Sequence, residues 1–222
     1  MLYTSTRDNS IRVSAAQAIA QGISEEGGLF VPVELPHFDI DKISSMTTIS
    51  YIDRAKTVLK EFLTDFSEEE LDYCVSGAYA AEKFSSPQIA PTVNVDGNKN
   101  ILELWHGPTC AFKDMALQLL PYLMTVSAKK TADGKTIVIL VATSGDTGKA
   151  ALEGFKNVDH TKILVFYPVD GVSPMQKLQM TTQEGDNVAV CAINGNFDDA
   201  QSAVKSIFTN AEIKDELAKK NM

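Results

Sequence analysis

Three unbroken runs of apolar, largely β-branched residues stand out in the second half of the chain, at 136–142, 162–168 and 187–194. Runs of this kind are typical of strands that are buried on both faces of a sheet. A loop and a segment with helical spacing of apolar residues follow each run, so strand and helix alternate. Such alternation predicts βαβ units and a parallel sheet with helices packed on it, that is, an α/β fold. A further strand is expected at 100–105.

Side chains that can cap helices mark several helix starts. Ser50 precedes one stretch with apolar residues at helical spacing, and Ser67 with Glu70 three residues later forms a capping box before another. In the second half, Ser173 followed by Pro174 is a typical N-cap and first helical position. These signals predict helices that begin at residues 51, 68 and 174.

The chain is expected to fall into three parts. The segment 85–98, rich in Pro and turn-forming residues, is the best boundary. The predicted parts are a mainly helical N-terminal domain at 1–95, a segment at 96–130, and a small α/β subdomain with parallel strands at 131–222. Pro121 must end or kink the helix in the middle part, because it has no N–H to donate.

Composition narrows the class of function. The 222 residues carry a formal net charge of −9, which argues against the basic surface that nucleic acids and anionic membranes require. Three cysteines, Cys74, Cys110 and Cys191, show neither metal-ligand nor disulfide spacing. The first ten residues are polar and no apolar run could span a bilayer, so neither a signal peptide nor a membrane segment is expected. These features predict a cytoplasmic protein without a metal site.

Lys113 begins an apolar helical run directly after a Gly-Pro-Thr turn. If Thr109 caps this helix, the helix dipole and the apolar neighbours favour a neutral amine at Lys113 over an ammonium. A neutral lysine amine is the nucleophile that forms a Schiff base with an aldehyde. The alternative is a surface lysine balanced by Asp114, and position alone favours this alternative because structural charges are far commoner. His106, in the same turn, also fits a structural hydrogen-bonding role better than a chemical one.

A second candidate site is the loop Thr-Ser-Gly-Asp-Thr-Gly at 143–148, which joins a predicted strand to a helix. Ligands of open α/β sheets bind at this edge, and N–H groups at a helix start suit anions. Ser144, Gly145 and Thr147 allow a phosphate or carboxylate to approach, whereas Asp146 would repel it. The loop fits neither a Walker nor a dinucleotide motif. Equally supported is an interpretation in which Asp146 or Thr147 is an N-cap and the glycines form turns.

Taken in order, these motifs resemble those of threonine synthases, pyridoxal-phosphate (PLP) enzymes of the tryptophan-synthase-β fold type, also called fold type II. The segment HGPTCAFKD at 106–114 resembles the family segment whose lysine holds PLP. The loop TSGDTG resembles the family loop, at which related PLP lyases usually carry Asn in place of the Asp. The resemblance covers essentially the whole chain, and it extends to YTSTRD, GISEEGGLFVP, YPVDGVSPMQKLQM and INGNFDDAQSAVK.

The resemblance implies a function and roles for individual residues. Threonine synthases convert O-phospho-L-homoserine and water into L-threonine and phosphate. Lys113 is expected to hold PLP through a Schiff base and to move protons, and Asp146 to lie near the 3′-oxygen of the cofactor. The implied substrate-binding residues, at two anion sites, are Ser144, Gly145 and Thr147 in the loop, and His106 and Thr109 in the lysine turn.

One departure from the family pattern shapes the expectation. Family members continue past this C-terminus into a part with a Gly/Asn-rich loop that holds the cofactor phosphate, and no such loop follows Asn194. The chain is therefore expected to be an N-terminal portion, inactive alone, with the remaining part of the same protein as its partner. Two alternatives stay open: a threonine or serine dehydratase of the same fold type, which the Asp of SGDTG and the HGPT turn disfavour, and a non-catalytic binding or interaction fragment.

Overall fold

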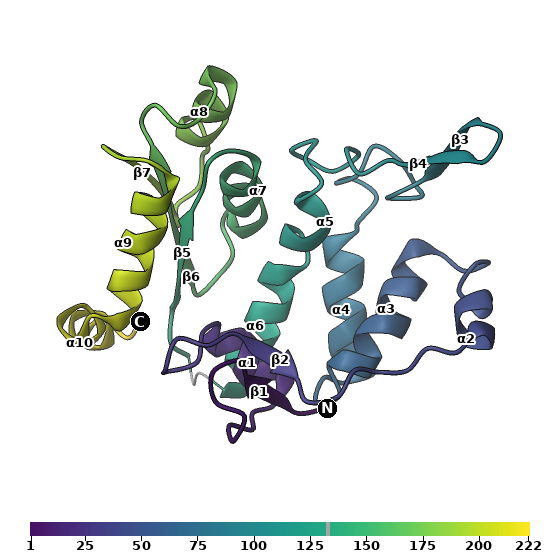
Figure 1. The fold of residues 1–222 in the computed structure, drawn as a ribbon, viewed down its shortest axis with the longest axis horizontal. Coiled ribbons are helices and arrows are strands. Elements are labelled where there is room, and N and C mark those ends of the chain that lie inside the picture. The colour runs from purple at the N-terminus through teal and green to yellow at the C-terminus, as the bar shows by residue number, and fades with distance from the viewer. Residues whose placement is uncertain (132–133) are drawn as a thin grey trace. The chain divides into compact units, whose positions relative to one another are not determined.

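The computed structural model describes residues 1–131 and 134–222 (Figure 1). They form two compact units: Met1–Glu103 with the segment that begins at Tyr122, and Leu104–Pro121 with Gly134–Met222. The three-part division at 1–95, 96–130 and 131–222 stays a prediction. Within the described residues, no helix has both the length and the apolar character needed to cross a membrane.

Helices dominate the first unit, and they begin where side chains cap them. Ser50 Oγ accepts from the N–H of Asp53 at 3.1 Å, and Ser67 and Glu70 exchange both bonds of a capping box. Both predicted helix starts are therefore confirmed. The helices of this unit are α1 (Ala15–Gln21), α2 (Ile40–Ser45), α3 (Tyr51–Phe62), α4 (Glu68–Ala78) and most of α6 (Leu120–Thr131). Strands β1 (Tyr3–Ser5) and β2 (Phe30–Pro32) form a short antiparallel pair.

The strand expected at 100–105 is shorter than predicted and lies in an antiparallel pair outside the parallel sheet. It forms β4 (Lys99–Leu102) and pairs antiparallel with β3 (Thr92–Asp96), which lies inside the segment expected to be only a boundary. A tight turn at Gly97, with φ 53°, supports this hairpin. Every residue of both strands is exposed, and β3 lies in a segment whose Pro and turn-forming residues indicated a boundary.

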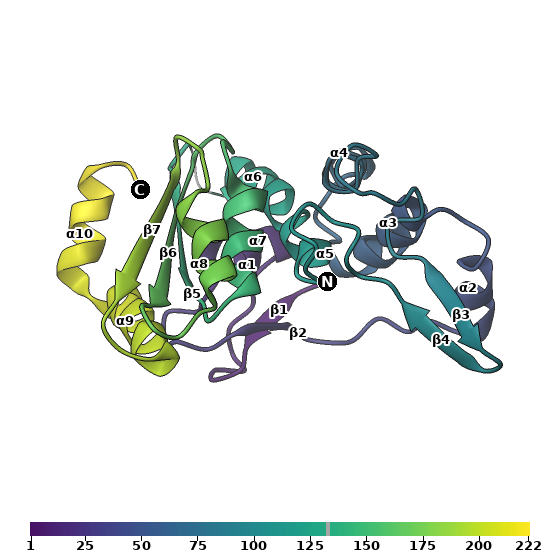
Figure 2. The same ribbon diagram turned by 90° about the horizontal axis from the view of Figure 1, so that it is seen from above.

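The second unit is the predicted α/β unit. A parallel sheet in the order β5-β6-β7 is formed from the three apolar runs, as expected. Helices α7 and α9 pack on opposite faces of this sheet (Figures 1 and 2). The elements are α5 (Asp114–Leu117), β5 (Ile137–Ala142), α7 (Asp146–Phe155), β6 (Thr161–Pro168), α8 (Pro174–Thr181), β7 (Val188–Ile193), α9 (Phe197–Thr209) and α10 (Ala211–Lys219).

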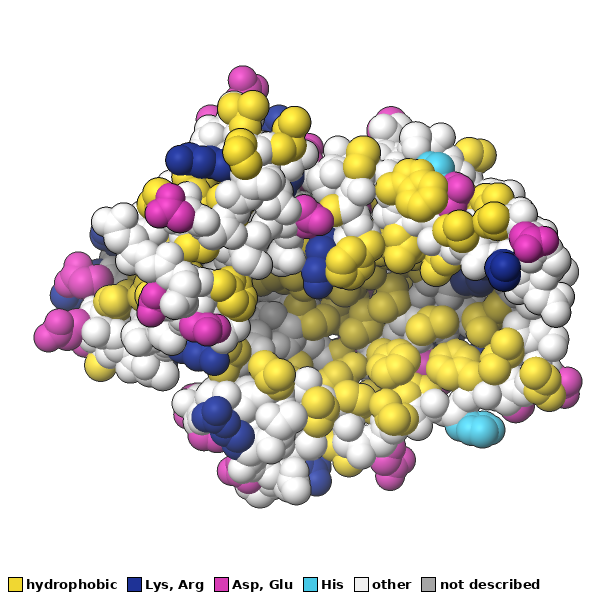
Figure 3. Space-filling view, turned by 45° about the horizontal axis from the view of Figure 1, so that its top comes forward, with side chains coloured by type: hydrophobic (Ala, Val, Ile, Leu, Met, Phe, Trp, Pro, Cys, Tyr) yellow, Lys and Arg dark blue, Asp and Glu magenta, His cyan; other side chains and the backbone are white. Residues whose placement is uncertain are grey.

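Burial along the sheet differs from the expectation. The central strand β6 buries most of its residues, whereas β5 is half-buried throughout and β7 is half-buried or exposed. The expectation of full burial is wrong for β5 and β7 because each has a strand on one side only in the described sheet. Helix α8 lies farther out: Met175 and Leu178 are exposed, and Figure 3 shows hydrophobic side chains at the surface over α8, at its upper left.

A break separates α5 from α6, and α5 packs against α7. Helix α5 ends at Leu117, and Pro121 stands in the first turn of α6, where a missing N–H costs nothing. The predicted interruption at Pro121 is thus confirmed. A Cβ added to Gly154 of α7 would overlap the carbonyl oxygen of Leu117, so only glycine lets α5 and α7 approach this closely.

Candidate active site

The helix after the Gly-Pro-Thr turn starts later than the sequence predicted. It begins at Asp114, and Lys113 occupies the N-cap position. The expectation that Thr109 caps the helix is therefore wrong. Cys110 adopts a left-handed conformation with φ 58°, which a right-handed helix through this residue does not allow. Helix α5 has only four residues, so it is shorter than the helix that the dipole argument assumed.

The side chain of Lys113 is half-buried and poorly paired. Its Nζ lies 4.8 Å from the centroid of the Phe112 ring, which is itself 58% exposed. Within the part of the chain that the structure describes, the amine has neither an ion pair nor a hydrogen bond. Asp114, the proposed charge partner in the surface-lysine alternative, points elsewhere. The amine is therefore available to a ligand.

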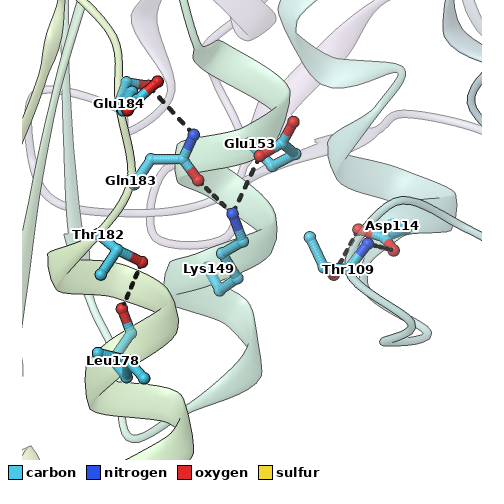
Figure 4. Close-up of polar contacts among 8 residues, drawn as sticks. All are labelled: Thr109, Asp114, Lys149, Glu153, Leu178, Thr182, Gln183 and Glu184. Carbon is cyan, nitrogen blue, oxygen red and sulfur yellow. Dashed lines mark hydrogen bonds and ion pairs between the residues drawn. The ribbon is translucent and has the colours of Figure 1, made fainter.

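Asp114 is fully buried, and Figure 4 shows its contact with Thr109 across the turn. Its Oδ2 accepts from the N–H of Thr109 at 2.8 Å, and its Oδ1 accepts from the hydroxyl of Thr109 at 2.7 Å. Burial raises the pKa of Asp114, the bonds from Thr109 and Ala111 lower it, and the charge of Glu153 adds to the rise, so that the net direction is upward. A Cβ on Gly107 would lie 2.5 Å from that of Asp114, so the turn is packed directly onto the carboxyl group.

His106 lies at the start of the same turn. Its ring stacks on that of Trp105, with centroids 5.8 Å apart and planes 29° apart. His106 is partly buried, whereas Trp105 is exposed, with 50% of its surface accessible. The turn thus places His106, Thr109 and Lys113 within one short segment, and a chemical role for His106 stays a prediction.

The loop at 143–148 is organised by Thr143, which the sequence analysis did not single out. Its buried Oγ1 accepts from the N–H groups of Gly145, at 3.1 Å, and Gly148, at 3.0 Å, and donates to the carbonyl of Gly145. Gly145 is the N-cap of α7, so the interpretation of Asp146 or Thr147 as the N-cap is wrong. A hydroxyl residue immediately after a predicted buried strand was the signal available in the sequence.

A pocket of about 450 Å³ opens at this loop. The four predicted residues Ser144, Gly145, Asp146 and Thr147 line it, together with Gln176 of α8 and Phe197 of α9. The structure therefore brings these four together, at the carboxyl end of β5, as the position of the loop predicted. The sequence did not identify Gln176 and Phe197 as pocket residues. They belong to the helices after the next two strands, and their approach to the loop depends on how those helices pack.

Gln176 has two roles at this pocket. Its Oε1 accepts from the N–H of Ser173 at 3.1 Å, and Ser173 Oγ accepts from the N–H of Gln176, which completes a capping box and confirms Ser173 as the N-cap. Its Nε2 donates to Asp146 Oδ1 at 2.9 Å. The amide orientation is thus fixed by the cap, and Gln176 presents a donor to Asp146.

A second polar cluster ties α7 to the end of α8 (Figure 4). Lys149 pairs with Glu153 at 3.0 Å and donates to the side-chain oxygen of Gln183. Burial would raise the pKa of Glu153, but the bond and charge of Lys149 outweigh it and lower the pKa. The loop at 143–148 and the lysine turn both belong to the second unit. That the two form a single site stays a prediction.

The second unit has the architecture of α/β enzymes that present strand–helix loops to a ligand at one edge of a parallel sheet. Comparisons with known proteins narrow this class. Residues 2–79 match the family model described as threonine synthase N terminus. The chain is 40% identical over 212 residues to the threonine synthase of Pseudomonas aeruginosa, and 36% identical over 209 residues to that of Escherichia coli.

Solved structures agree with the sequence comparison. The crystal structure of PLP-bound threonine synthase from Brucella melitensis matches 98% of this chain with a TM-score of 0.86 and 38% identity. Residues 2–79 match the model of the threonine synthase N terminus, and the whole chain is similar to threonine synthases, which confirms the resemblance and the α/β fold class. The chain covers 44% and 46% of the two bacterial sequences and 46% of the Brucella chain, so it spans less than half of their length.

Proposed function

We propose that this chain carries the lysine-bearing part of a PLP-dependent threonine synthase. The observation that carries the proposal is the half-buried amine of Lys113, which has no ion pair or hydrogen bond among the described residues. It lies within the segment HGPTCAFKD, which resembles the cofactor-binding segment of the family. The Brucella relative is described as PLP-bound, which supports the same cofactor here.

Each residue of the proposed site has a role that its surroundings support. When bound, PLP supplies an electron sink for the carbon atoms next to the substrate nitrogen. The amine of Lys113 holds the cofactor and then moves protons at Cα and Cβ of the substrate. Ser144, Gly145 and Thr147 offer hydroxyl and N–H groups at the start of α7 to an anionic group. Asp146, which accepts from Gln176, serves as an acceptor toward the 3′-oxygen of the cofactor.

The proposed reaction converts O-phospho-L-homoserine and water into L-threonine and phosphate, with phosphate leaving from Cγ and water adding at Cβ. We assign this activity to the full length of the protein. The 222 residues alone are proposed to be inactive, because they cover less than half of each relative, and the rest of such a protein is their proposed partner. A cytoplasmic location is part of the same proposal.

The experiment is a pair of assays on a full-length protein that carries this sequence. Phosphate release from O-phospho-L-homoserine is measured beside oxoacid formation from L-threonine. Phosphate release that is lost in Lys113→Arg is expected, since arginine keeps the charge but cannot bond covalently to an aldehyde. Oxoacid formation without phosphate release would identify a dehydratase instead. Phosphate release that survives in Lys113→Arg would exclude Lys113 as the reacting amine.

A further inference from the structure

The donors of residues 109–111 in the lysine turn all point inward. The N–H and the hydroxyl of Thr109 both go to the carboxylate of Asp114, at 2.8 Å and 2.7 Å. The N–H of Ala111 also bonds to Asp114, and that of Cys110 donates to the carbonyl of Gly107 at 3.1 Å. An anion site needs backbone or side-chain donors that point at the ligand. The donors of residues 109–111 are already bonded to Asp114 or Gly107, so they do not point at a ligand.

The hydroxyl of Thr109 has a fixed polarity as a result. When Asp114 is ionised it only accepts, so the hydroxyl proton then lies between Thr109 Oγ1 and Asp114 Oδ1. Toward any other group, Thr109 Oγ1 can therefore act only as a hydrogen-bond acceptor, through a lone pair. Asp114 is fully buried and Thr109 is half-buried, so a ligand approaches Thr109 from the side away from Asp114.

We propose that ionised Asp114 makes Thr109 an obligate hydrogen-bond acceptor, so that Thr109 recognises a protonated amine of the ligand and not an anion. This inference rests on the proposed function, in which the amine is the ammonium group of the amino-acid substrate. It reassigns Thr109 from the anion sites expected from the sequence. Among the loop residues, Ser144, Gly145 and Thr147 then bind the anionic group, at the start of α7. Thr109 is the specificity-determining residue, and Asp114 is the positioning residue behind it.

One substitution should reverse the polarity of the turn. In Asp114→Asn, the amide oxygen must face the N–H of Thr109, because that N–H can only donate. The new NH₂ group then donates to Thr109 Oγ1, and the hydroxyl proton turns outward. Asp114→Asn therefore converts Thr109 from an acceptor into a donor with almost no change in shape.

The test uses two small ions as probes at constant ionic strength and neutral pH, without PLP. Amide resonances of residues 107–114 are followed by NMR while methylammonium or inorganic phosphate is added to the 222-residue chain. Wild type and Thr109→Ser, which keeps the hydroxyl, are expected to respond to methylammonium at this turn and not to phosphate. Thr109→Val should lose the methylammonium response. Asp114→Asn should prefer phosphate, with a reversal of about tenfold, the size of one hydrogen bond to a charged group.

Three results would overturn the inference: a phosphate response of the wild type that Thr109→Val removes, an unchanged preference in Asp114→Asn, or no response of the wild-type turn to either ion. If Asp114→Asn fails to fold, the wild type, Thr109→Ser and Thr109→Val still decide. Failure here is distinguishable from failure of the proposed function, because the titration contains no cofactor and the role of Lys113 is assayed separately.

Discussion

At the scale of single residues, a buried carboxylate immediately after a half-buried lysine is the main feature of the site. Asp114 has three donors for its two oxygens, and it lies against Gly107 without space for another atom. A buried charge costs free energy unless it is hydrogen-bonded, and here the bonds all come from one turn. The shape of that turn, and with it the placement of Lys113, therefore depends on Asp114.

Gly107→Ala should disrupt this packing. The added methyl group would lie 2.5 Å from Asp114 Cβ, so the turn or the carboxyl group must move. We expect the free energy of unfolding to fall by about 1–3 kcal/mol, the usual cost of overpacking, in chemical denaturation. Gly97→Asn is the matched control, because nothing lies within 4 Å of an added Cβ and Asn tolerates a φ of 53°. Equal stability of wild type and Gly107→Ala would show that the contact is not tight.

Asp114 also predicts a pH dependence of stability. Its pKa is raised in the folded chain above the ordinary value of 3.8, so the folded state favours the protonated form. The stabilising contribution is complete below 3.8 and is lost as the pH rises through the raised pKa. Relative to Asp114→Asn, which does not titrate here, the wild type should therefore lose stability as the pH rises from about 3.5 toward neutrality. Urea unfolding of both proteins across this range measures the difference. A difference that grows in favour of the wild type would contradict the assigned direction.

At the scale of elements, α8 is attached to α7 by Gln176 in its first turn, which bonds to Asp146, and by Gln183 just after its end, which bonds to Lys149. Between these points the buried Met180 lies against Gly148, so a larger residue at 148 would meet it. The pocket at the start of α7 thus depends on a helix that follows the next strand in the sequence. Its shape is a property of two strand–helix connections together.

Two variants separate the two roles of Gln176. Gln176→Glu keeps an acceptor for the N–H of Ser173, but it places a second carboxylate against Asp146. It should lower the yield of PLP trapped on Lys113 by about three- to tenfold, with little change in stability. Ser173→Ala removes the hydroxyl cap and keeps the bond to Asp146, so it should cost about 1 kcal/mol of stability and leave trapping unchanged. Reductive trapping and thermal unfolding of both variants test this. Identical behaviour of the two would mean that Gln176 acts only as a cap.

Local signals explain which elements could be predicted from the sequence. Ser50, Ser67 and Ser173 each act within four residues, so the helix starts were readable, and the long apolar runs identified the sheet strands. The lysine turn was not predictable, because no glycine marks the left-handed conformation at Cys110 and the bonds from Thr109 to the later Asp114 fit no helix-capping pattern. Strand β3 was missed because its short alternation of Val93 and Val95 with polar residues lies in a segment rich in Pro and turn formers. The pocket loop was found from its place after a strand, but its partners on α8 and α9 were not.

At the scale of the whole molecule, the net charge of −9 opposes the approach of an anionic cofactor or substrate. Salt screens such repulsion, with a Debye length of about 10 Å at 0.1 M. The rate at which PLP modifies Lys113 should therefore rise between about 0.01 and 0.1 M ionic strength, which stopped-flow absorbance can follow. A rate that falls with salt would mean that positive charge near the site outweighs the overall charge of the chain.

The central claim is that the amine of Lys113 is already shaped to receive an aldehyde cofactor. The most direct measurement is to mix the 222-residue chain with PLP, reduce with borohydride and map the adduct by peptide mass spectrometry. We predict one pyridoxyl group, on Lys113, that is lost in Lys113→Arg and retained in Lys149→Arg, whose wild-type lysine is ion-paired in the same unit. Label spread over many lysines, or an equal yield in Lys113→Arg, would contradict the claim.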